Sequence, residues 1–313
     1  MPASVYSSLG DRAARYVAGG PGREVFPFHV GDTWMEPAVG CRMEDLRVDQ
    51  HPGLHRYGPV RGLPPLVDAI VERVRARTGD RIEPHQVLLT AGATGGLAAV
   101  VGAVVAPGED VLLVSPFWPL IAGIVRTFSA NPIPVPLLAD GLPTPAEARA
   151  ALDRALTANT AAVYLNTPNN PTGRVLPAAL VEAIAGWAHD RGLWLIADEV
   201  YEDFVYDGSD HTYTRPLLPE RTFAAYSFSK AYGMAGNRVG YVIGPAAAMV
   251  EVAKVGIYAF YSAPTASQVS ALAALGGAGD GWIRAALSQY VAIGTESAAA
   301  LGLEPPDGST FLF

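Results

Sequence analysis

The fold of this chain is constrained most by a regular alternation of short apolar segments with longer helical ones, which begins near residue 64. Leu66, Ile70 and Val74 recur at helical spacing, and Gly79 ends that segment. Short apolar strands separated by helices form a mainly parallel sheet covered on both faces, so we predict an α/β three-layer sandwich. The predicted strands are 86–90, 111–114, 133–137, 162–165, 194–197, 223–226 and 239–243, with the proline-containing 133–137 at an edge. The other predicted helices are 95–105, 120–128, 145–156 and 177–191.

Composition narrows the class of protein. Half of the 313 residues are apolar and 17% are charged, which is typical of a compact globular chain. The net charge of -8 argues against a nucleic-acid partner. Cys41 is the single cysteine, and the six histidines show no ligand spacing, so we expect no disulfide and no metal site. No signal pattern or membrane-length apolar run occurs, so we expect no membrane partner and a cytoplasmic protein.

Loops with chemically informative residues follow five of the predicted strands. In a parallel sheet such loops meet at one edge, where ligands bind. These loops are 91–96, 115–119, 166–173, 198–201 and 227–230. Outside the alternating region, we expect residues 1–50 to be irregular, 265–302 to be helical and 310–313 to begin a strand.

Lys230 is one of two lysines in a chain whose other basic residues are arginines. Arginine cannot replace a lysine that must lose its proton and form a Schiff base, because guanidinium stays charged. Lys230 also follows Ser227 and Ser229 and precedes Arg238 by eight residues. This setting suggests imine chemistry. A surface lysine in a glycine-rich loop is the alternative, and these residues alone favour neither.

The first two loops contain possible contacts for an anion and a flat ring. Small residues in 91–97 allow backbone N–H groups at a helix start to approach an anion, and Thr94 adds a hydroxyl. The loop lacks the Gly-Lys-Ser/Thr ending of a nucleotide-binding P-loop. Trp118 could stack on an aromatic ligand, although a core tryptophan is the better interpretation of that residue alone.

The later loops add polar groups of a matching kind. Asp198 ends a very apolar strand, where a carboxylate is costly unless it is paired, and a protonated ring nitrogen would be a suitable partner. Tyr201 could reach the same ligand, and Ser227 and Arg238 could hold a phosphate. The asparagines of 166–173 could donate to a ligand oxygen. Together these groups describe pyridoxal 5′-phosphate, which has a phosphate, a ring nitrogen, a phenolic oxygen and a carbonyl for a lysine.

Three motifs appear in a recognisable order: Asn169-Asn170-Pro171-Thr172-Gly173, Asp198-Glu199-Val200-Tyr201, and Ser227-Phe228-Ser229-Lys230 with Arg238. From about Phe28 to Phe313 the sequence resembles the fold-type I pyridoxal-phosphate enzymes, specifically the class I/II aminotransferases of the aspartate aminotransferase type. Each motif is moderately specific and the three together are highly specific.

The resemblance implies catalytic roles at the matching positions. Lys230 would form the internal aldimine and then move a proton between Cα and C4′ of the adduct. Asp198 would keep the pyridine nitrogen protonated, so that the ring accepts electrons. Asn170 and Tyr201 would bond the ring 3′-oxygen, and Trp118 would stack on the ring.

The resemblance also implies a phosphate site and a partner subunit. Ala93 (through its N–H), Thr94, Ser227 and Arg238 would hold the phosphate. Tyr57 matches a tyrosine that reaches the phosphate of the neighbouring subunit, which implies a homodimer with shared active sites. Gly31 matches a glycine whose backbone contacts the substrate carboxylate, and the side chain of Asn170 would also contact the substrate.

For domain organisation, the resemblance implies a large cofactor-binding domain at 52–264 and a smaller α/β domain made of 1–51 and 265–313. Gly308-Ser309-Thr310-Phe311 is similar to the stretch that opens the C-terminal strands of the small domain. In the family the chain then continues to an arginine that clamps the substrate α-carboxylate. We therefore expect a truncated small domain that lacks this arginine.

The function implied is transfer of an amino group between an amino acid and a 2-oxo acid through a Lys230 aldimine. A pyridoxal-phosphate lyase, cyclase or decarboxylase would use the same cofactor residues, so the motifs do not separate these activities. An inactive truncated fragment and a ligand-sensing domain are further alternatives. The sequence does not identify the amino acid or the oxo acid.

Overall fold

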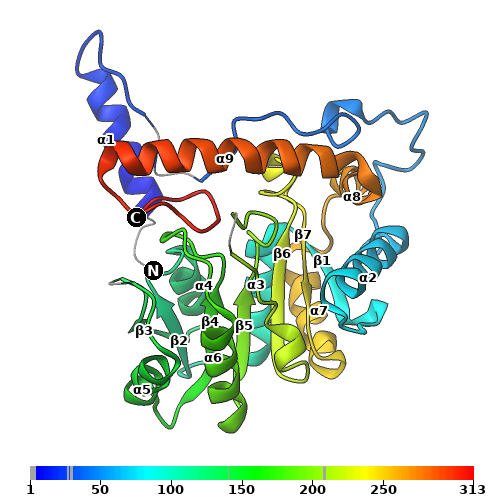
Figure 1. Cartoon of the computed structure of the whole chain (residues 1–313). Helices are drawn as coiled ribbons and strands as arrows, with labels where there is room; N and C mark the ends of the chain where they lie inside the picture. The colour runs from blue at the N-terminus through cyan, green and yellow to red at the C-terminus, as the bar shows by residue number, and fades with distance from the viewer. Residues whose placement is uncertain (1–4, 27, 29–30, 140, 207–208) are drawn as a thin grey trace.

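The centre of the molecule is a mixed β-sheet. The structure, a computed structural model, describes residues 5–26, 28, 31–139, 141–206 and 209–313. In this part of the chain the sheet has the order β1-β7-β6-β5-β4-β2-β3 (Figure 1). β7 runs antiparallel to both of its neighbours, and the other pairs are parallel. The strands are β1 (Val87–Thr90), β2 (Asp110–Ser115), β3 (Asn131–Pro136), β4 (Thr160–Asn166), β5 (Trp194–Asp198), β6 (Thr222–Ser227) and β7 (Gly240–Ile243).

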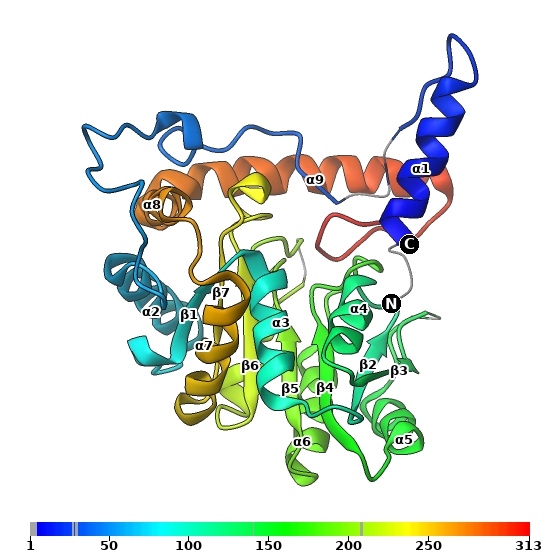
Figure 2. The same ribbon diagram turned by 180° about the vertical axis from the view of Figure 1, so that it is seen from behind.

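Helices cover both faces of this sheet, which confirms the predicted three-layer α/β architecture. Side chains alternate along β2, so that Val111 and Leu113 face one helical layer whereas Leu112 and Val114 face the other. The layer in front in Figure 2 holds α3 (Gly92–Val104), α4 (Leu120–Thr127) and α7 (Ala246–Phe260). The opposite layer holds α2 (Pro64–Thr78), α5 (Pro145–Ala155) and α6 (Ala178–Asp190).

Local sequence signals account for several helix ends. α5 begins with a capping box, in which Thr144 accepts a hydrogen bond from the Glu147 N–H and the Glu147 side chain accepts one in return. α2 begins at a proline and ends at Gly79, whose φ of 71° is left-handed. Among the described residues, four short 3₁₀ helices lie in the connections: Met43–Asp45, Pro84–Gln86, Arg215–Leu217 and Ala235–Asn237.

The remaining helices lie outside the sheet layers. α8 (Thr265–Ala273) continues through a π-helical turn (Ala274–Ala278) into α9 (Gly279–Leu301), which crosses above the carboxyl edge of the sheet (Figure 1). The segment 31–50 packs along α9, since the Trp282 indole N–H donates to the Glu36 carbonyl at 2.7 Å and the Trp34 and Tyr290 rings lie 5.3 Å apart. This packing supports the proposed pairing of 1–51 with 265–313 in one small domain. Residues 1–4, 27 and 29–30 of that proposed domain lie outside the described residues. So do residues 140, 207 and 208 of the proposed large domain.

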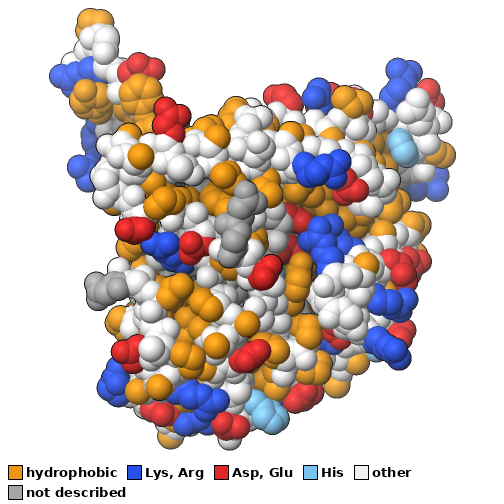
Figure 3. All heavy atoms as spheres, in the orientation of Figure 1, with side chains coloured by type: hydrophobic (Ala, Val, Ile, Leu, Met, Phe, Trp, Pro, Cys, Tyr) orange, Lys and Arg blue, Asp and Glu red, His pale blue; other side chains and the backbone are white. Residues whose placement is uncertain are grey.

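Two expectations for the ends of the chain were wrong. Residues 1–50 are not wholly irregular, because Val5–Ala18 forms helix α1, which projects from the rest of the molecule (Figures 1 and 3). Residues 310–313 do not form a strand. Gly308 makes one isolated β-bridge with Val205, and the backbone of Ser309 is bonded instead to Phe204 and Tyr206.

The surface carries charges of both signs. On the face shown in Figure 3, acidic and basic side chains are interspersed among hydrophobic ones. No helix in the described part of the chain combines the length and apolar character that crossing a bilayer requires.

Candidate active site

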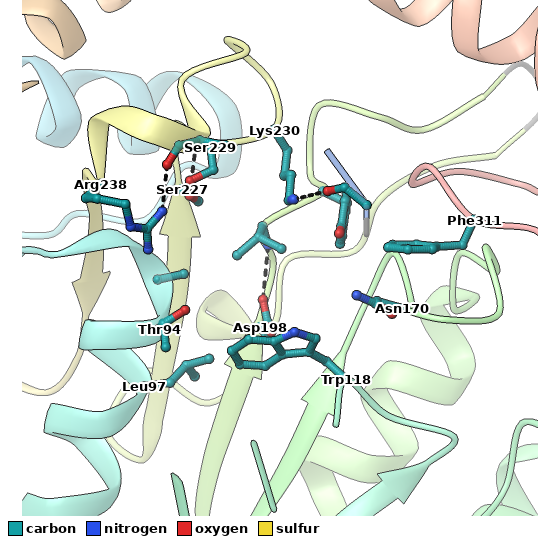
Figure 4. Close-up of a pocket in the computed structure, with 15 residues that line it drawn as sticks. Thr94, Leu97, Trp118, Asn170, Asp198, Ser227, Ser229, Lys230, Arg238 and Phe311 are labelled. Atoms are coloured by element: carbon teal, nitrogen blue, oxygen red, sulfur yellow. Dashed lines mark hydrogen bonds between the residues drawn. The ribbon is translucent and has the colours of Figure 1, made fainter. Parts of the chain in front are cut away.

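The loops that follow β1, β2, β4, β5 and β6 meet above the carboxyl edge of the parallel strands, as predicted from their order. They enclose a cavity of about 270 Å³ (Figure 4). The structure places every predicted site residue except Tyr57 in its lining. The lining residues are Gly31, Ala93, Thr94, Leu97, Trp118, Asn170, Asp198, Val200, Tyr201, Ser227, Ser229, Lys230, Ala235, Arg238 and Phe311.

Lys230 extends into the middle of this cavity from the loop after β6. Its Nζ donates a hydrogen bond to the carbonyl oxygen of Gly31 (Figure 4). Burial lowers the pKa of the Lys230 amine, and the positive charge of Arg238 acts in the same direction, while Asp32 and Asp198 oppose it. The net lowering increases the fraction of neutral amine, which is the nucleophilic and basic form.

Asp198 lies at the end of β5 with only 4% of its surface exposed. The Tyr164 hydroxyl donates to its Oδ2 at 2.8 Å, and the Val200 N–H donates to its Oδ1 over a longer 3.4 Å. Burial raises the pKa of Asp198 to about 6, although both hydrogen bonds lower it. The hydrogen bonds from the protein therefore do not fully offset the cost of burying this carboxylate, which is in this sense under-compensated. A cationic N–H from a ligand would offset the remainder.

The loop 166–173 is fixed by its own asparagines. The Asn170 N–H donates to Asn166 Oδ1 at 2.7 Å, while Asn169 Oδ1 accepts from both the backbone and the hydroxyl of Thr172. These bonds leave the Asn170 side chain directed into the cavity (Figure 4). Tyr201 lies on the same side, with its ring centroid 6.0 Å from Lys230 Nζ.

An anion-binding arrangement occupies the other end of the cavity. α3 begins at Gly92 without a side-chain cap, so its first N–H groups are available to a ligand. The Arg238 guanidinium lies against this helix start, where it donates to the Ala235 carbonyl at 2.8 Å and to the Ala91 carbonyl at 3.4 Å. A Cβ at position 92 would lie 2.3 Å from Arg238 Nη2, so the approach requires glycine. The uncapped helix start and the guanidinium together suit a phosphate.

Of the predicted site residues, Trp118 lines the cavity and Tyr57 does not. Trp118 presents its indole beside Asp198 in the cavity (Figure 4), so it is not simply a core residue. Tyr57 lies outside the cavity with 88% of its surface exposed, and its ring meets the edge of Tyr261 at 5.0 Å. Its expected contact with a partner subunit stays a prediction.

Sequence reasoning missed several residues of the site. Ser229 lies within the lysine motif and Val200 within the Asp-Glu-Val-Tyr motif, so a closer reading of those motifs could have included both. Phe311 follows the Gly308-Ser309-Thr310 stretch but was assigned to a strand. Tyr164 lies within a predicted apolar strand, and no signal in the sequence indicates that its hydroxyl reaches Asp198.

A buried lysine, an acid and an anion site lie together at the carboxyl edge of a mainly parallel sheet. Ligands of α/β proteins bind at this edge, so the arrangement is that of a ligand-binding α/β protein. The family model for aminotransferase class I and II matches residues 33–292. This chain belongs to the class I and II aminotransferase family, which confirms the resemblance seen in the motifs.

Individual relatives agree with this assignment. The chain is 34% identical over 225 residues to a probable aspartate/prephenate aminotransferase of Thermus aquaticus, covering 71% of this chain and 57% of that one. It is 35% identical over 260 residues to an arginine–pyruvate transaminase of Pseudomonas aeruginosa, covering 81% and 64%. The chain therefore spans about three fifths of the length of these relatives.

Solved structures show the same fold over nearly the whole chain. The aspartate aminotransferase of Thermus thermophilus with maleate superposes with a TM-score of 0.88 at 28% identity, covering 99% of this chain and 81% of that one. The N-succinyldiaminopimelate aminotransferase of Mycobacterium tuberculosis gives a TM-score of 0.84 at 30% identity, covering 99% and 80%.

Proposed function

We propose that this protein is a pyridoxal-phosphate-dependent aminotransferase that moves an amino group between an amino acid and a 2-oxo acid. The observation that carries the proposal is the convergence of Lys230, with its lowered pKa, and the under-compensated Asp198 in one cavity with an anion site. The names of the relatives, which include aspartate/prephenate and arginine–pyruvate aminotransferases, support the same reaction type.

The chemistry of the lining fits this cofactor group by group. Arg238 and the start of α3 suit the phosphate, and Asp198 suits a protonated ring nitrogen. When bound, pyridoxal phosphate supplies a ring that withdraws electrons from the substrate Cα. The residues that would hold it are Ala93, Thr94, Ser227 and Arg238 at the phosphate, Asp198 at the ring nitrogen, Asn170 and Tyr201 at the ring oxygen, Trp118 at the ring face and Lys230 at the carbonyl, with Tyr57 contributed by a partner subunit.

Within this proposal Lys230 has two tasks. Its amine would hold the carbonyl of the cofactor, and in its neutral form it would accept the proton from the substrate Cα. The Gly31 carbonyl, which accepts a hydrogen bond from Nζ, holds the amine on the substrate side of the cavity. The substrate itself would lie between Gly31 and Asn170.

The test uses the fact that the sequence contains one other lysine. Wild-type protein incubated with pyridoxal phosphate and reduced with borohydride should retain one phosphopyridoxyl group, which peptide mass spectrometry should locate at Lys230. The Lys230→Ala variant should lose the label. Lys254, which is exposed on α7 and paired with Glu251 at 2.6 Å, supplies the control, since Lys254→Ala should label normally.

Labelling at Lys254, or equal labelling of both variants, would contradict the cofactor proposal.

Turnover then distinguishes aminotransfer from the lyase and decarboxylase alternatives. An aminotransferase converts a 2-oxo acid to the corresponding amino acid when a second amino acid is present, whereas a decarboxylase releases carbon dioxide. Release of carbon dioxide or ammonia without formation of a new amino acid would refute the reaction type proposed.

We further propose a homodimer with shared sites. Tyr57 and Tyr258 are 88% and 89% exposed, and Tyr57 contacts Tyr261, so these tyrosines supply exposed aromatic surface for a partner subunit. Sedimentation equilibrium should give about twice the chain mass of 32.8 kDa, and a mass of one chain at micromolar concentration would refute the proposal. A cytoplasmic location stays a prediction from the sequence.

A further inference from the structure

Tyr164 lies in β4, directly behind the acid of the cavity. In the sheet it pairs with Ile196 of β5, so Asp198 stands two residues further along the neighbouring strand and on the same face. Tyr164 is fully buried, and its ring belongs to the core cluster that contains Leu113 and Ile196. The hydroxyl at the end of the ring donates to Asp198 Oδ2 at 2.8 Å. A residue from the middle of an apolar strand thereby places its polar atom against the carboxylate.

This hydroxyl acts as a donor to the carboxylate. Burial raises the pKa of Tyr164 well above its ordinary value, and the negative charge of Asp198 raises it further. Tyr164 therefore keeps its proton at neutral pH and donates it to Oδ2. The other carboxylate oxygen, Oδ1, accepts the longer 3.4 Å bond from the Val200 N–H. Oδ1 is thus the oxygen of Asp198 with more capacity for a ligand.

Several neighbours determine how tightly Asp198 holds a proton. Burial raises its pKa to about 6, and the charge of the adjacent Glu199 acts in the same direction. Of the groups that lower the pKa, the Tyr164 hydroxyl has the largest effect, followed by the Val200 N–H and the charge of Lys230. The hydrogen bond from Tyr164 is therefore the main interaction within the protein that favours the ionised form of this buried acid.

We propose that Tyr164 is a positioning residue, whose hydroxyl fixes the Asp198 carboxylate and so keeps the proton that Asp198 shares with a bound ring on the ring nitrogen. The proposal rests on the proposed function, since the ring belongs to the proposed cofactor. A carboxylate that loses its donor becomes a stronger base, so Asp198 without the hydroxyl would draw that proton away from the ring. A ring without the proton withdraws electrons less strongly. Tyr164 lies outside the cavity lining and therefore acts through Asp198.

The first measurement is made on the cofactor-free protein. Tyr164→Phe removes the hydroxyl and keeps the ring in the core. Carbon-13 NMR of protein labelled at its aspartate carboxyls follows Asp198, whose signal is identified by its loss in Asp198→Asn. The titration midpoint should lie at about pH 6 in wild type. In Tyr164→Phe it should rise by about one pH unit or more, because a hydrogen bond to a charged group is lost.

Tyr226→Phe is the matched control for this measurement. Tyr226 is also a buried strand tyrosine, but its hydroxyl donates to Glu199 Oε2 at 2.7 Å. Its removal costs the sheet a comparable buried hydrogen bond and leaves the donor of Asp198 in place. The midpoint of Asp198 in Tyr226→Phe should therefore stay at the wild-type value.

The second measurement uses pyridoxal phosphate labelled with nitrogen-15 in its ring, and it requires no turnover. In wild type and Tyr226→Phe the nitrogen-15 signal of the complex should be that of a protonated ring. In Tyr164→Phe the signal should move toward that of a neutral ring. An unchanged Asp198 midpoint or an unchanged nitrogen-15 signal in Tyr164→Phe would overturn the role of Tyr164. If wild-type protein binds no pyridoxal phosphate, the proposed function itself fails, and the carbon-13 titration still reports the bond between Tyr164 and Asp198.

A second variant covers the case in which Tyr164→Phe loses its cooperative unfolding transition. Tyr164→3-fluorotyrosine keeps the ring and the hydroxyl but makes the hydroxyl more acidic, so that it is a stronger donor. The Asp198 midpoint should then fall below the wild-type value. A midpoint equal to that of wild type would contradict the proposal.

Discussion

Asp198 and Glu199 are adjacent carboxylates in opposite environments. Asp198 faces the cavity with Tyr164 as its one close donor. Glu199 faces the core, where it accepts hydrogen bonds from the N–H and hydroxyl of Thr214 and from the Tyr226 hydroxyl. Burial alone would raise both pKa values, but His211, whose Nε2 lies 3.6 Å from Glu199 Oε2, and then the Thr214 donors reverse the effect and lower the pKa of Glu199. The contrast identifies Asp198 as the carboxylate with capacity for a ligand.

This contrast predicts a pH effect on the stability of the cofactor-free protein. Burial raises the pKa of Asp198 to about 6 from an ordinary value of 3.8, so the folded form holds the proton more tightly than the unfolded form. The free energy of unfolding therefore falls as pH rises from about 4 to about 6. Asp198→Asn cannot ionise, so between about pH 4.5 and about pH 7 it should gain about 2 kcal/mol relative to wild type.

Urea denaturation of both proteins at the two pH values measures this difference. Asp190→Asn is the control, because Asp190 is exposed and makes only a 3.5 Å pair with Arg149, so its variant should follow wild type at both pH values. A constant difference between wild type and Asp198→Asn across the pH range would show that Asp198 has the same pKa in the folded and unfolded states.

At the scale of one element, α3 contributes its first turn to the site. Gly92 has a φ of 69° and leaves space for the Arg238 guanidinium. Gly92→Ala should displace that guanidinium and weaken phosphate binding by about tenfold, because a charge-assisted contact is lost. The measurement is inhibition of pyridoxal phosphate binding by inorganic phosphate, followed by absorbance.

A second glycine separates strain from the loss of the anion contact. Gly108 has a φ of 86° with no atom near its missing Cβ, and it lies outside the cavity lining. Both alanine variants should lose about 1 to 2 kcal/mol of stability through backbone strain. Only Gly92→Ala should bind phosphate less tightly. An equal loss of phosphate affinity in both variants would refute the steric argument.

Most strands of the sheet were predictable from the sequence because they are short apolar runs that are buried almost continuously and alternate with helical segments. The helix α1 was missed although Leu9, Ala13 and Val17 recur at helical spacing in its sequence. Its side chains from residue 7 onward are exposed or only half-buried, so it adds little to the core. The apolar residues at 311–313 suggested a strand. Their backbone has no strand partner, and Phe311 packs against a loop and a glycine instead, which local periodicity does not encode.

The site was predictable to the extent that its residues are polar and follow strands. Asp198 and Lys230 are unusual in their local sequence, and the order of the strands brings them together. Tyr164 and Phe311 are different, since their roles depend on a neighbouring strand and on a segment far along the chain. Contacts of that kind are set by tertiary packing and leave no local pattern.

At the scale of the whole molecule, a buried ion cluster joins α2 to the loop after β5. Arg73 pairs with Asp203 at 2.7 Å, and Arg77 pairs with the same carboxylate at 2.6 Å, while Glu202 lies 3.4 Å from Arg73. These acids follow Tyr201 directly. The cluster therefore connects a helix at the edge of the sheet to the segment that carries the cavity residues Asp198 and Tyr201.

Breaking this cluster should destabilise the protein severely. Arg73→Ala leaves two nearly buried carboxylates with Arg77 as their one remaining arginine partner, which costs about 3 to 5 kcal/mol. Arg75 provides the control on the same helix, because it is exposed and pairs only with Glu72. Arg75→Ala should cost less than about 1 kcal/mol. Urea denaturation compares the two, and similar losses would show that burial does not govern the strength of these pairs.

The contact between Gly31 and Phe311 has a consequence for the order in which the protein is made. During synthesis the N-terminal part of a chain leaves the ribosome first and begins to fold first. The residues of the anion site and Lys230 emerge well before Phe311, which bounds the opposite end of the cavity. The end of the cavity where Phe311 packs against Gly31 therefore closes only after the residues of the anion site and Lys230 have been made.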